Sequence, residues 1–158
     1  MSARAWYRDH DARTLIVLGY LPWLGGLNLV WETAQLPLYT LWREAPAGTI
    51  ALSVAHCTGG DIAIGVAALL MALILGREGA LAQWRWRRIA VWTALAGTVY
   101  TVFSEWSNTV ILGSWAYSEL MPVLKVAGVD IGLSPLLQWL VLPPLALVLA
   151  GKSRRRSS

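Results

Sequence analysis

The stretch Ala55-His56-Cys57-Thr58-Gly59-Gly60-Asp61 lies near the start of a long apolar run that continues as IAIGVAALLMALILG to Gly76. A run of this length is typical of a transmembrane helix, which needs about 20 predominantly apolar residues. A charged side chain inside such a helix costs about 2.5–3.5 kcal/mol on insertion scales. Sequences that keep such residues usually use them or pair them, so this stretch is a candidate for function.

The composition is that of an integral membrane protein. Of the 158 residues, 56% are hydrophobic and 14% are charged, and the mean hydropathy is +0.52. A soluble domain would carry about 25% charged residues. The single cysteine excludes an internal disulfide and a CxxC metal or redox pair. No basic-aromatic surface of the nucleic-acid-binding type remains outside the apolar runs, so the sequence indicates no nucleic acid partner.

Four apolar runs predict an all-α fold, an integral membrane four-helix antiparallel transmembrane bundle that forms one domain over residues 1–158. At about 20 residues per span, the spans are expected at about 14–35, 50–76, 89–112 and 131–150, with tails at 1–13 and 151–158. No A-x-A-like cleavage site follows the first run, so we expect that run to be a retained span.

Several residues are expected to interrupt the helices or to let them approach closely. Pro22 and Pro143-Pro144 are expected to kink or break their spans. The pairs Gly25-Gly26 and Gly59-Gly60 favour close helix contacts or a local distortion. The semi-polar loop at 113–130 is long enough to include a short interfacial helix.

The placement of the basic residues predicts the orientation. The N-terminal tail, the turn at 77–88 and the C-terminal tail hold three, four and four Lys or Arg, whereas the other two loops hold only Arg43 and Lys125. Cytoplasmic segments are enriched in Lys and Arg, so both termini and the middle turn are expected in the cytoplasm. The compact architecture without a signal peptide favours a bacterial inner membrane.

Polar residues from all four spans fall at similar depth in the outer half of the layer. With a rise of about 1.5 Å per residue, Glu32 lies about 27 Å beyond the start of its span and Glu105 about 24 Å beyond the start of its own. From the opposite direction, His56, Asp61 and Gln138 lie about 9, 16 and 10 Å below the outer ends of their spans. The inner half is mostly Ala, Leu, Val and Ile. This layering predicts one polar pocket that opens to the outer face.

Spacing along each helix assigns roles within this pocket. Gln35 follows Glu32 by three positions and Asn108 follows Glu105 by three, so each carboxylate has a carboxamide beside it on one helix face. His56 and Asp61 are about 140° apart around an ideal helix. We expect a catalytic group of His56, Glu32, Glu105 and Asp61. The residues expected to bind substrate or to orient that group are Gln35, Asn108, Gln138, Trp115 and Tyr117.

Two chemistries fit these residue types. His56, Glu32 and Glu105 could ligate a divalent metal, with Zn, Mn or Fe favoured by oxygen ligands plus one imidazole. A metal-bound water would then attack an ester or amide. Without a metal, the same group could hold one shared proton for acid-base chemistry. Against both, Glu32 and Glu105 are near enough to the helix ends to reach water and cap them, whereas Asp61 is the deepest of the three.

The sequence leaves three function classes open. The first is a metal-binding or acid-base centre acting on a membrane-soluble or outer-face substrate, in which replacing His56 or Glu105 abolishes activity. The second is a proton- or ion-coupled transporter or channel component, which with four spans would need to oligomerise. The third is an accessory subunit of a larger membrane complex. The lipid bilayer is the one partner common to all three, and the chain carries no H-E-x-x-H, G-x-S-x-G or P-loop motif that would choose between them.

Overall fold

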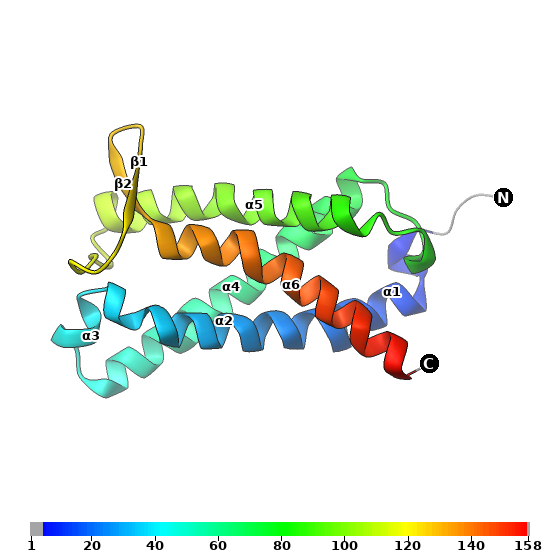
Figure 1. Ribbon diagram of the computed structural model, residues 1–158, viewed down its shortest axis with the longest axis horizontal. Coiled ribbons are helices and arrows are strands. Elements are labelled where there is room, and N and C mark those ends of the chain that lie inside the picture. Colours follow the sequence, from blue (N-terminus) through cyan, green and yellow to red (C-terminus); the bar gives the residue numbers. More distant parts are fainter. Residues whose placement is uncertain (1–4, 158) are drawn as a thin grey trace.

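The computed structural model describes residues 5–157, so the ends of the two expected tails, residues 1–4 and 158, lie outside the described residues. Most of the described chain is helical (Figure 1). The first helical run comprises α1 (His10–Thr14), a π-helical segment (Leu15–Tyr20) and α2 (Leu21–Gln35). The other long helices are α4 (Ala47–Leu75), α5 (Trp86–Trp106), which continues as a π-helical segment (Ser107–Ile111), and α6 (Leu133–Ser157).

Short elements join these helices. Single 3-10 turns occupy Trp6–Arg8, Leu36–Leu38 and Leu81–Gln83, and α3 is one turn at Leu41–Glu44. The loop expected to include an interfacial helix instead forms an antiparallel hairpin of β1 (Val123–Val126) and β2 (Val129–Gly132). Its turn residues Ala127 and Gly128 have φ of 49° and 84°. Two consecutive positive φ values are those of the tight turn that matches strand twist, and the valine-rich flanks favour strands.

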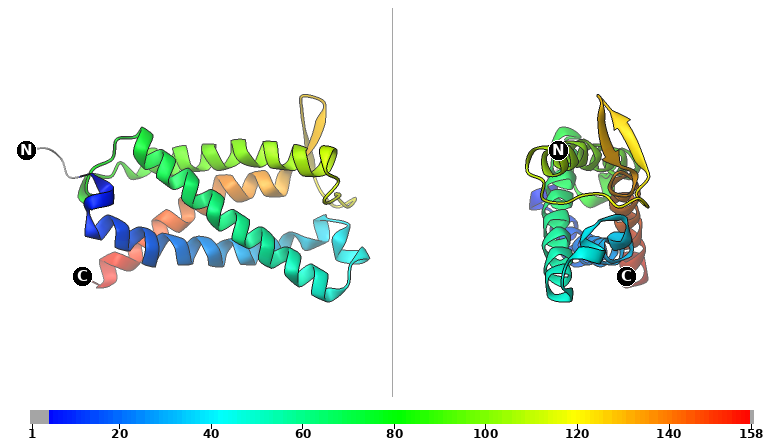
Figure 2. Two further views of the ribbon diagram at one scale, coloured as in Figure 1. Left: turned by 180° about the vertical axis from the view of Figure 1, so that it is seen from behind. Right: turned by 90° about the vertical axis from the view of Figure 1, so that its left-hand side faces the viewer.

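The long helices run antiparallel and surround a common axis when seen end-on (Figure 2). Both described ends of the chain and the turn between α4 and α5 lie at one end, which we call the terminal end (Figure 1). The hairpin and α3 lie at the opposite end, which we call the hairpin end. Helix α5 packs against α6 and α4, and α2 packs against α4 and α6. Helix α4 crosses the bundle diagonally, so its N-terminal half lies away from α5 (Figure 2).

Three helices are long and apolar enough to cross a membrane: His10–Leu38, Ala47–Leu75 and Leu133–Arg154. The fourth expected span is present as a long helix but differs in composition. Helix α5 has 21 residues, yet its most apolar part is less hydrophobic than that of the other three. Three threonines, Glu105 and two arginines within its length account for the difference.

Most of the expected interruptions are absorbed without a break. The π-helical segment at Leu15–Tyr20 precedes Pro22, which cannot donate a backbone N–H to the helix. Helix α6 stays continuous through Pro143-Pro144 and changes direction near its middle (Figure 1). At Gly25 the expected close contact is present, because an added Cβ would lie 3.2 Å from Cδ1 of Ile62.

At Gly59 and Gly60 neither expectation is met. Helix α4 is regular through both residues, and an added Cβ would meet no atom within 4 Å at either position. These glycines neither distort the helix nor bring another helix close; they leave open space beside α4.

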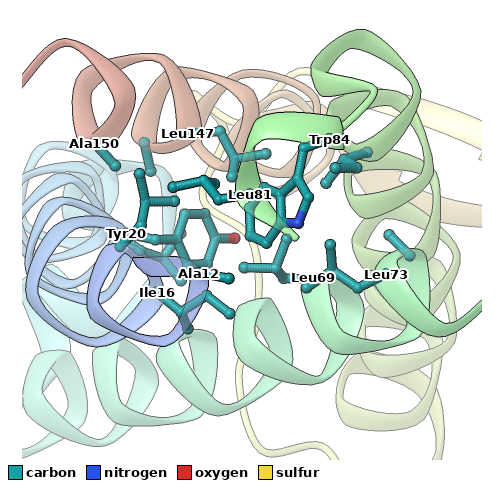
Figure 3. Close-up of a cluster of buried hydrophobic side chains, with 14 residues drawn as sticks. Ala12, Ile16, Tyr20, Leu69, Leu73, Leu81, Trp84, Leu147 and Ala150 are labelled. Carbon is teal, nitrogen blue, oxygen red and sulfur yellow. The ribbon is translucent and has the colours of Figure 1, made fainter. Parts of the chain in front are cut away.

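The terminal half of the bundle is filled by one apolar cluster (Figure 3). Residues from α1, the first π-helical segment, α4 and α6 meet there around Tyr20, which is fully buried. The hydroxyl of Tyr20 donates a hydrogen bond of 3.3 Å to the carbonyl of Gly65, and Trp84 and Leu81 close the cluster from the turn between α4 and α5. Polar side chains therefore concentrate in the other half.

At Gly97, helix α5 packs directly against Trp139 of α6, and Gly97→Ala is expected to destabilise the fold. An added Cβ would lie 2.0 Å from Cε3 of Trp139, a ring that is 3% exposed. Forcing such a contact costs about 1–3 kcal/mol, more than the gain of up to about 1 kcal/mol from replacing a helical glycine by alanine. Thermal unfolding in detergent, followed by circular dichroism, measures the change. Gly59→Ala is the control, because it meets nothing. A Gly97→Ala protein as stable as that control would contradict the prediction.

Candidate functional site

A cavity of about 740 Å³ lies between α2, α4, α5 and α6, in the half of the bundle nearer the hairpin end. Eight of the nine residues that the sequence singled out line it: Glu32, Gln35, His56, Asp61, Glu105, Asn108, Trp115 and Gln138. The ninth, Tyr117, contacts the cavity through Glu105. The helices thus bring together residues that are up to 106 positions apart in the chain.

The cavity opens sideways between α4 and α5. Of its lining residues, Leu52, His56 and Gly60 on α4 and Tyr100 on α5 are exposed. The diagonal path of α4 separates its N-terminal half from the C-terminal half of α5, where these residues lie (Figure 2). Thr49 and Ser114, toward the hairpin end, are exposed as well.

Gln138 is the centre of the polar cluster. It is 2% exposed, and its Nε2 donates to Oδ1 of Asn28 at 2.8 Å, Oδ2 of Asp61 at 2.8 Å and Oε1 of Glu32 at 3.1 Å. An amide nitrogen carries two hydrogens, so one hydrogen is shared between two acceptors. Gln138 on α6 therefore ties α2 to α4.

Further hydrogen bonds determine which way the amide groups of Gln35 and Asn28 are turned. Ser134 Oγ donates to Oε1 of Gln35 at 2.8 Å, which turns the Gln35 amide so that Nε2 donates to Oε1 of Glu32 at 2.7 Å. Nδ2 of Asn28 donates to the carbonyl of Leu24 at 2.8 Å, which leaves Oδ1 to accept from Gln138. The Glu32 carboxyl group therefore accepts hydrogen bonds from two neutral amides, those of Gln35 and Gln138.

The Glu32 and Asp61 carboxyl groups come together at one donor, because both accept from Nε2 of Gln138. Asp61 comes from α4 and Glu32 from α2, and depth alone predicted that they would meet. Two carboxylates at one place repel each other, and a proton held between them would remove that repulsion. The shared proton stays a prediction.

Glu105 forms a second carboxyl centre on α5. It is 5% exposed, and its carboxyl group accepts a hydrogen bond from the hydroxyl of Tyr117. The Tyr117 hydroxyl in turn accepts from the backbone N–H of Gly132 at 2.9 Å, which links this centre to β2. Burial raises the pKa of Tyr117, and the hydrogen bond to Glu105 raises this pKa further. Tyr117 therefore stays protonated and remains a donor.

Asn108 lines the same cavity as Glu105 but does not donate to its carboxyl group among the hydrogen bonds of the described residues. Nδ2 of Asn108 donates instead to the backbone carbonyl and to Oγ of Ser104, at 2.9 and 3.2 Å. A π-helical segment starts at Ser107, between Glu105 and Asn108. Tyr117, also predicted as a site residue, is the side chain that donates to Glu105.

His56 lies at the mouth of the cavity rather than beside the carboxyl pair. It is exposed, and the hydrogen bonds of the cluster do not include it. Among the described residues, no group of three or more His, Cys, Asp or Glu is arranged to hold a metal ion. The metal alternative with His56, Glu32 and Glu105 as ligands therefore has no geometric support among the described residues. Cys57 lines the cavity as a free thiol.

Several polar residues of the site were not singled out by the sequence, and three of them matter most for its geometry. Asn28 and Ser134 complete the hydrogen-bond cluster, and Tyr39 lines the cavity. Asn28 precedes Glu32 by four positions, one helical turn, and this spacing was a usable signal. Burial raises the pKa of Tyr39, and the negative charges of Glu105 and Glu32 raise this pKa further. Its position depends on the bridge between Tyr39 and Tyr117, which no local pattern predicts.

Comparison with known proteins finds no matching family model, no similar curated protein and no similar solved structure.

Proposed function

We propose that this chain is a four-span membrane protein whose cavity is an acid-base centre for a membrane-soluble substrate. The observation that carries the proposal is the meeting of three carboxyl groups, from α2, α4 and α5, in one cavity with a sideways opening. Buried ionisable groups inside a membrane bundle are costly and usually mark function. Access from the side suits a substrate that is dissolved in the bilayer.

The proposed topology places the cavity in the outer half of the membrane. The terminal end carries the described parts of both tails and the segment 77–88, which together hold ten of the twelve basic residues that the structure describes. Basic segments stay in the cytoplasm, so the hairpin end faces outward. In this arrangement α5 is the fourth span. It packs against α4 and α6 and contributes Thr101, Ser104 and Glu105 to the cavity lining.

The two carboxyl centres support proton donation at one place and proton removal at another. The Glu32–Asp61 pair holds one proton that it can donate to a substrate atom. Glu105, which accepts a hydrogen bond from Tyr117, can take a proton from a second atom. The proton then returns from Glu105 to the pair through the cavity, where His56 at the mouth gives contact with water. The net reaction is an isomerisation that needs no co-reactant.

The packing of the terminal half favours this function over the transporter alternative. A transport path must cross the whole bundle, whereas the apolar cluster around Tyr20 fills the terminal half (Figure 3). Tyr20, Leu24, Leu69, Leu73 and Leu147 in that cluster are at most 1% exposed. A proton path through this region would need polar side chains or ordered water.

Deuterium transfer tests the proposed function and does not require the substrate to be identified beforehand. Purified protein is incubated in D₂O with a total lipid extract of the cells that make it, and the lipids are analysed by mass spectrometry. We expect one lipid class to gain deuterium at carbon, or an isomer of unchanged mass to form. Asp61→Asn is expected to slow this reaction by a factor of about 100 or more.

Glu119→Gln is the matched control, since Glu119 is exposed and outside the cavity lining. It is expected to react as the wild type does. No deuterium gain and no isomer with the wild-type protein, together with proton flux in proteoliposomes, would overturn the acid-base function in favour of transport.

A further inference from the structure

The cavity lining is rich in acidic groups and poor in basic ones. Its described lining residues include three carboxyl groups but no lysine or arginine. His56, the one imidazole, is exposed at the mouth. The salt bridges found among the described residues involve Asp11, Glu78 and Asp130, and none involves a cavity carboxyl group.

The cavity carboxyl groups therefore have only neutral hydrogen-bond donors. Gln138 and Gln35 donate to Glu32, and Tyr117 donates to Glu105. Any of these carboxyl groups that is ionised has no lysine or arginine beside it among the described lining residues. A buried charge without an oppositely charged partner is costly, and a cationic ligand would supply that partner.

Aromatic rings add to the preference for positive charge. Tyr39, Tyr100, Trp115 and Trp139 line the same cavity, and aromatic faces attract cations, most strongly where water is excluded. Burial raises the pKa of Tyr39, and negative charge on Glu105 and Glu32 raises this pKa further, which puts the phenol within electrostatic reach of both carboxyl groups. The rest of the lining includes apolar side chains such as Leu36, Leu52 and Ile64, which suit an aliphatic body.

We propose that the ligand of this cavity is an amphiphile whose polar end is an ammonium group. Its nitrogen lies among Glu32, Asp61 and Glu105, and its aliphatic part extends through the opening between α4 and α5 into the lipid. The cavity volume of about 740 Å³ falls within the range of about 300–1,000 Å³ that is usual for small-molecule sites. This inference rests on the proposed function for the site and adds the class of substrate.

Binding of three matched probes tests the inference. The probes share one brominated twelve-carbon chain and differ in the polar end, which is a dimethylamine, an alcohol or a carboxylate. The protein is held in micelles of a non-ionic maltoside detergent, which carries no ammonium group, and saturable quenching of tryptophan fluorescence reports binding, since Trp115 and Trp139 line the cavity. We expect the amine to bind at least about tenfold more tightly than the alcohol, as one charge-assisted hydrogen bond would give.

Two matched pairs of variants locate the binding. Gly60→Leu fills open space in the cavity, whereas Gly59→Leu fills open space outside the lining; only the first is expected to abolish saturable quenching. Glu105→Gln is expected to weaken amine binding about tenfold and to leave alcohol binding unchanged, and Glu119→Gln is expected to change neither. If Glu105→Gln does not fold, Asp61→Asn replaces it.

The outcomes separate this inference from the proposed function. An alcohol that binds as tightly as the amine, or a carboxylate that binds more tightly, would overturn the ammonium ligand even if deuterium transfer is observed. Preferential amine binding without deuterium transfer would keep the ligand class and remove the acid-base reaction. Quenching that persists in Gly60→Leu would show that the probe binds elsewhere and would also overturn the inference.

Discussion

In a Gln138→Leu variant we expect the bundle to lose about 2 kcal/mol of stability, because hydrogen bonds between membrane helices average about 0.6 kcal/mol each and this side chain makes three. Leucine cannot donate, so Asn28, Glu32 and Asp61 lose a common partner. These acceptors are buried or half-buried, and an orphaned buried acceptor costs about 1–3 kcal/mol. A loss of about 2 kcal/mol is therefore at the lower end of what these orphaned acceptors would cause.

Thermal unfolding in detergent, compared with Gln83→Leu, measures this loss. Gln83 is exposed, and a surface substitution of this kind usually changes stability by no more than about 0.5 kcal/mol. Equal unfolding temperatures for the two variants would show that the cluster around Gln138 is not a structural junction between α2, α4 and α6.

Glu105→Gln is expected to reduce the deuterium-transfer activity by a factor of about 100 to 10,000, which is the usual contribution of a positioned acid or base. Glutamine keeps the shape of the side chain and can still accept a hydrogen bond from Tyr117, but it cannot take up a proton. The protein should therefore insert and fold while the reaction stops.

Comparing His56→Ala with Glu105→Gln shows whether a side chain at the mouth of the cavity matters as much as one inside it. The sequence predicts that this change abolishes activity, whereas the exposed position of His56 leads us to expect a smaller loss than for Glu105→Gln. Both proteins are compared with the wild type in the same lipid extract, after their folding has been checked by size exclusion. Normal activity in both variants would rule out the cavity as the reacting site.

Much of the bundle could be predicted because it follows from local properties of the chain. Runs of about 20 apolar residues predict the long helices, and four such helices joined by short loops run antiparallel. The bias of Lys and Arg predicts which loops share an end, and the described ends of the chain do lie beside the turn between α4 and α5. The hairpin at 123–132 was missed because its short strands stand among residues that are equally compatible with an interfacial helix.

The depth of the site residues in the membrane could be predicted from the sequence, but the rotation of each helix about its own axis could not. A fixed rise per residue gives the height of Glu32, Asp61, Glu105 and Gln138 in the layer, so the sequence alone assigned them to one level. The direction in which each side chain points depends on how the helix is turned about its axis, which only packing against its neighbours determines.

The sequence by itself thus determined the helical class, the separation into a polar and an apolar half, and the choice of residues at the polar level. Only the tertiary structure decided that Gln138 joins Glu32 to Asp61, that Tyr117 rather than Asn108 holds Glu105, and that His56 stands at the mouth. The physical reason is that hydropathy and charge act residue by residue along the chain. Hydrogen bonds between helices depend instead on rotations and crossing angles that arise only when the side chains pack.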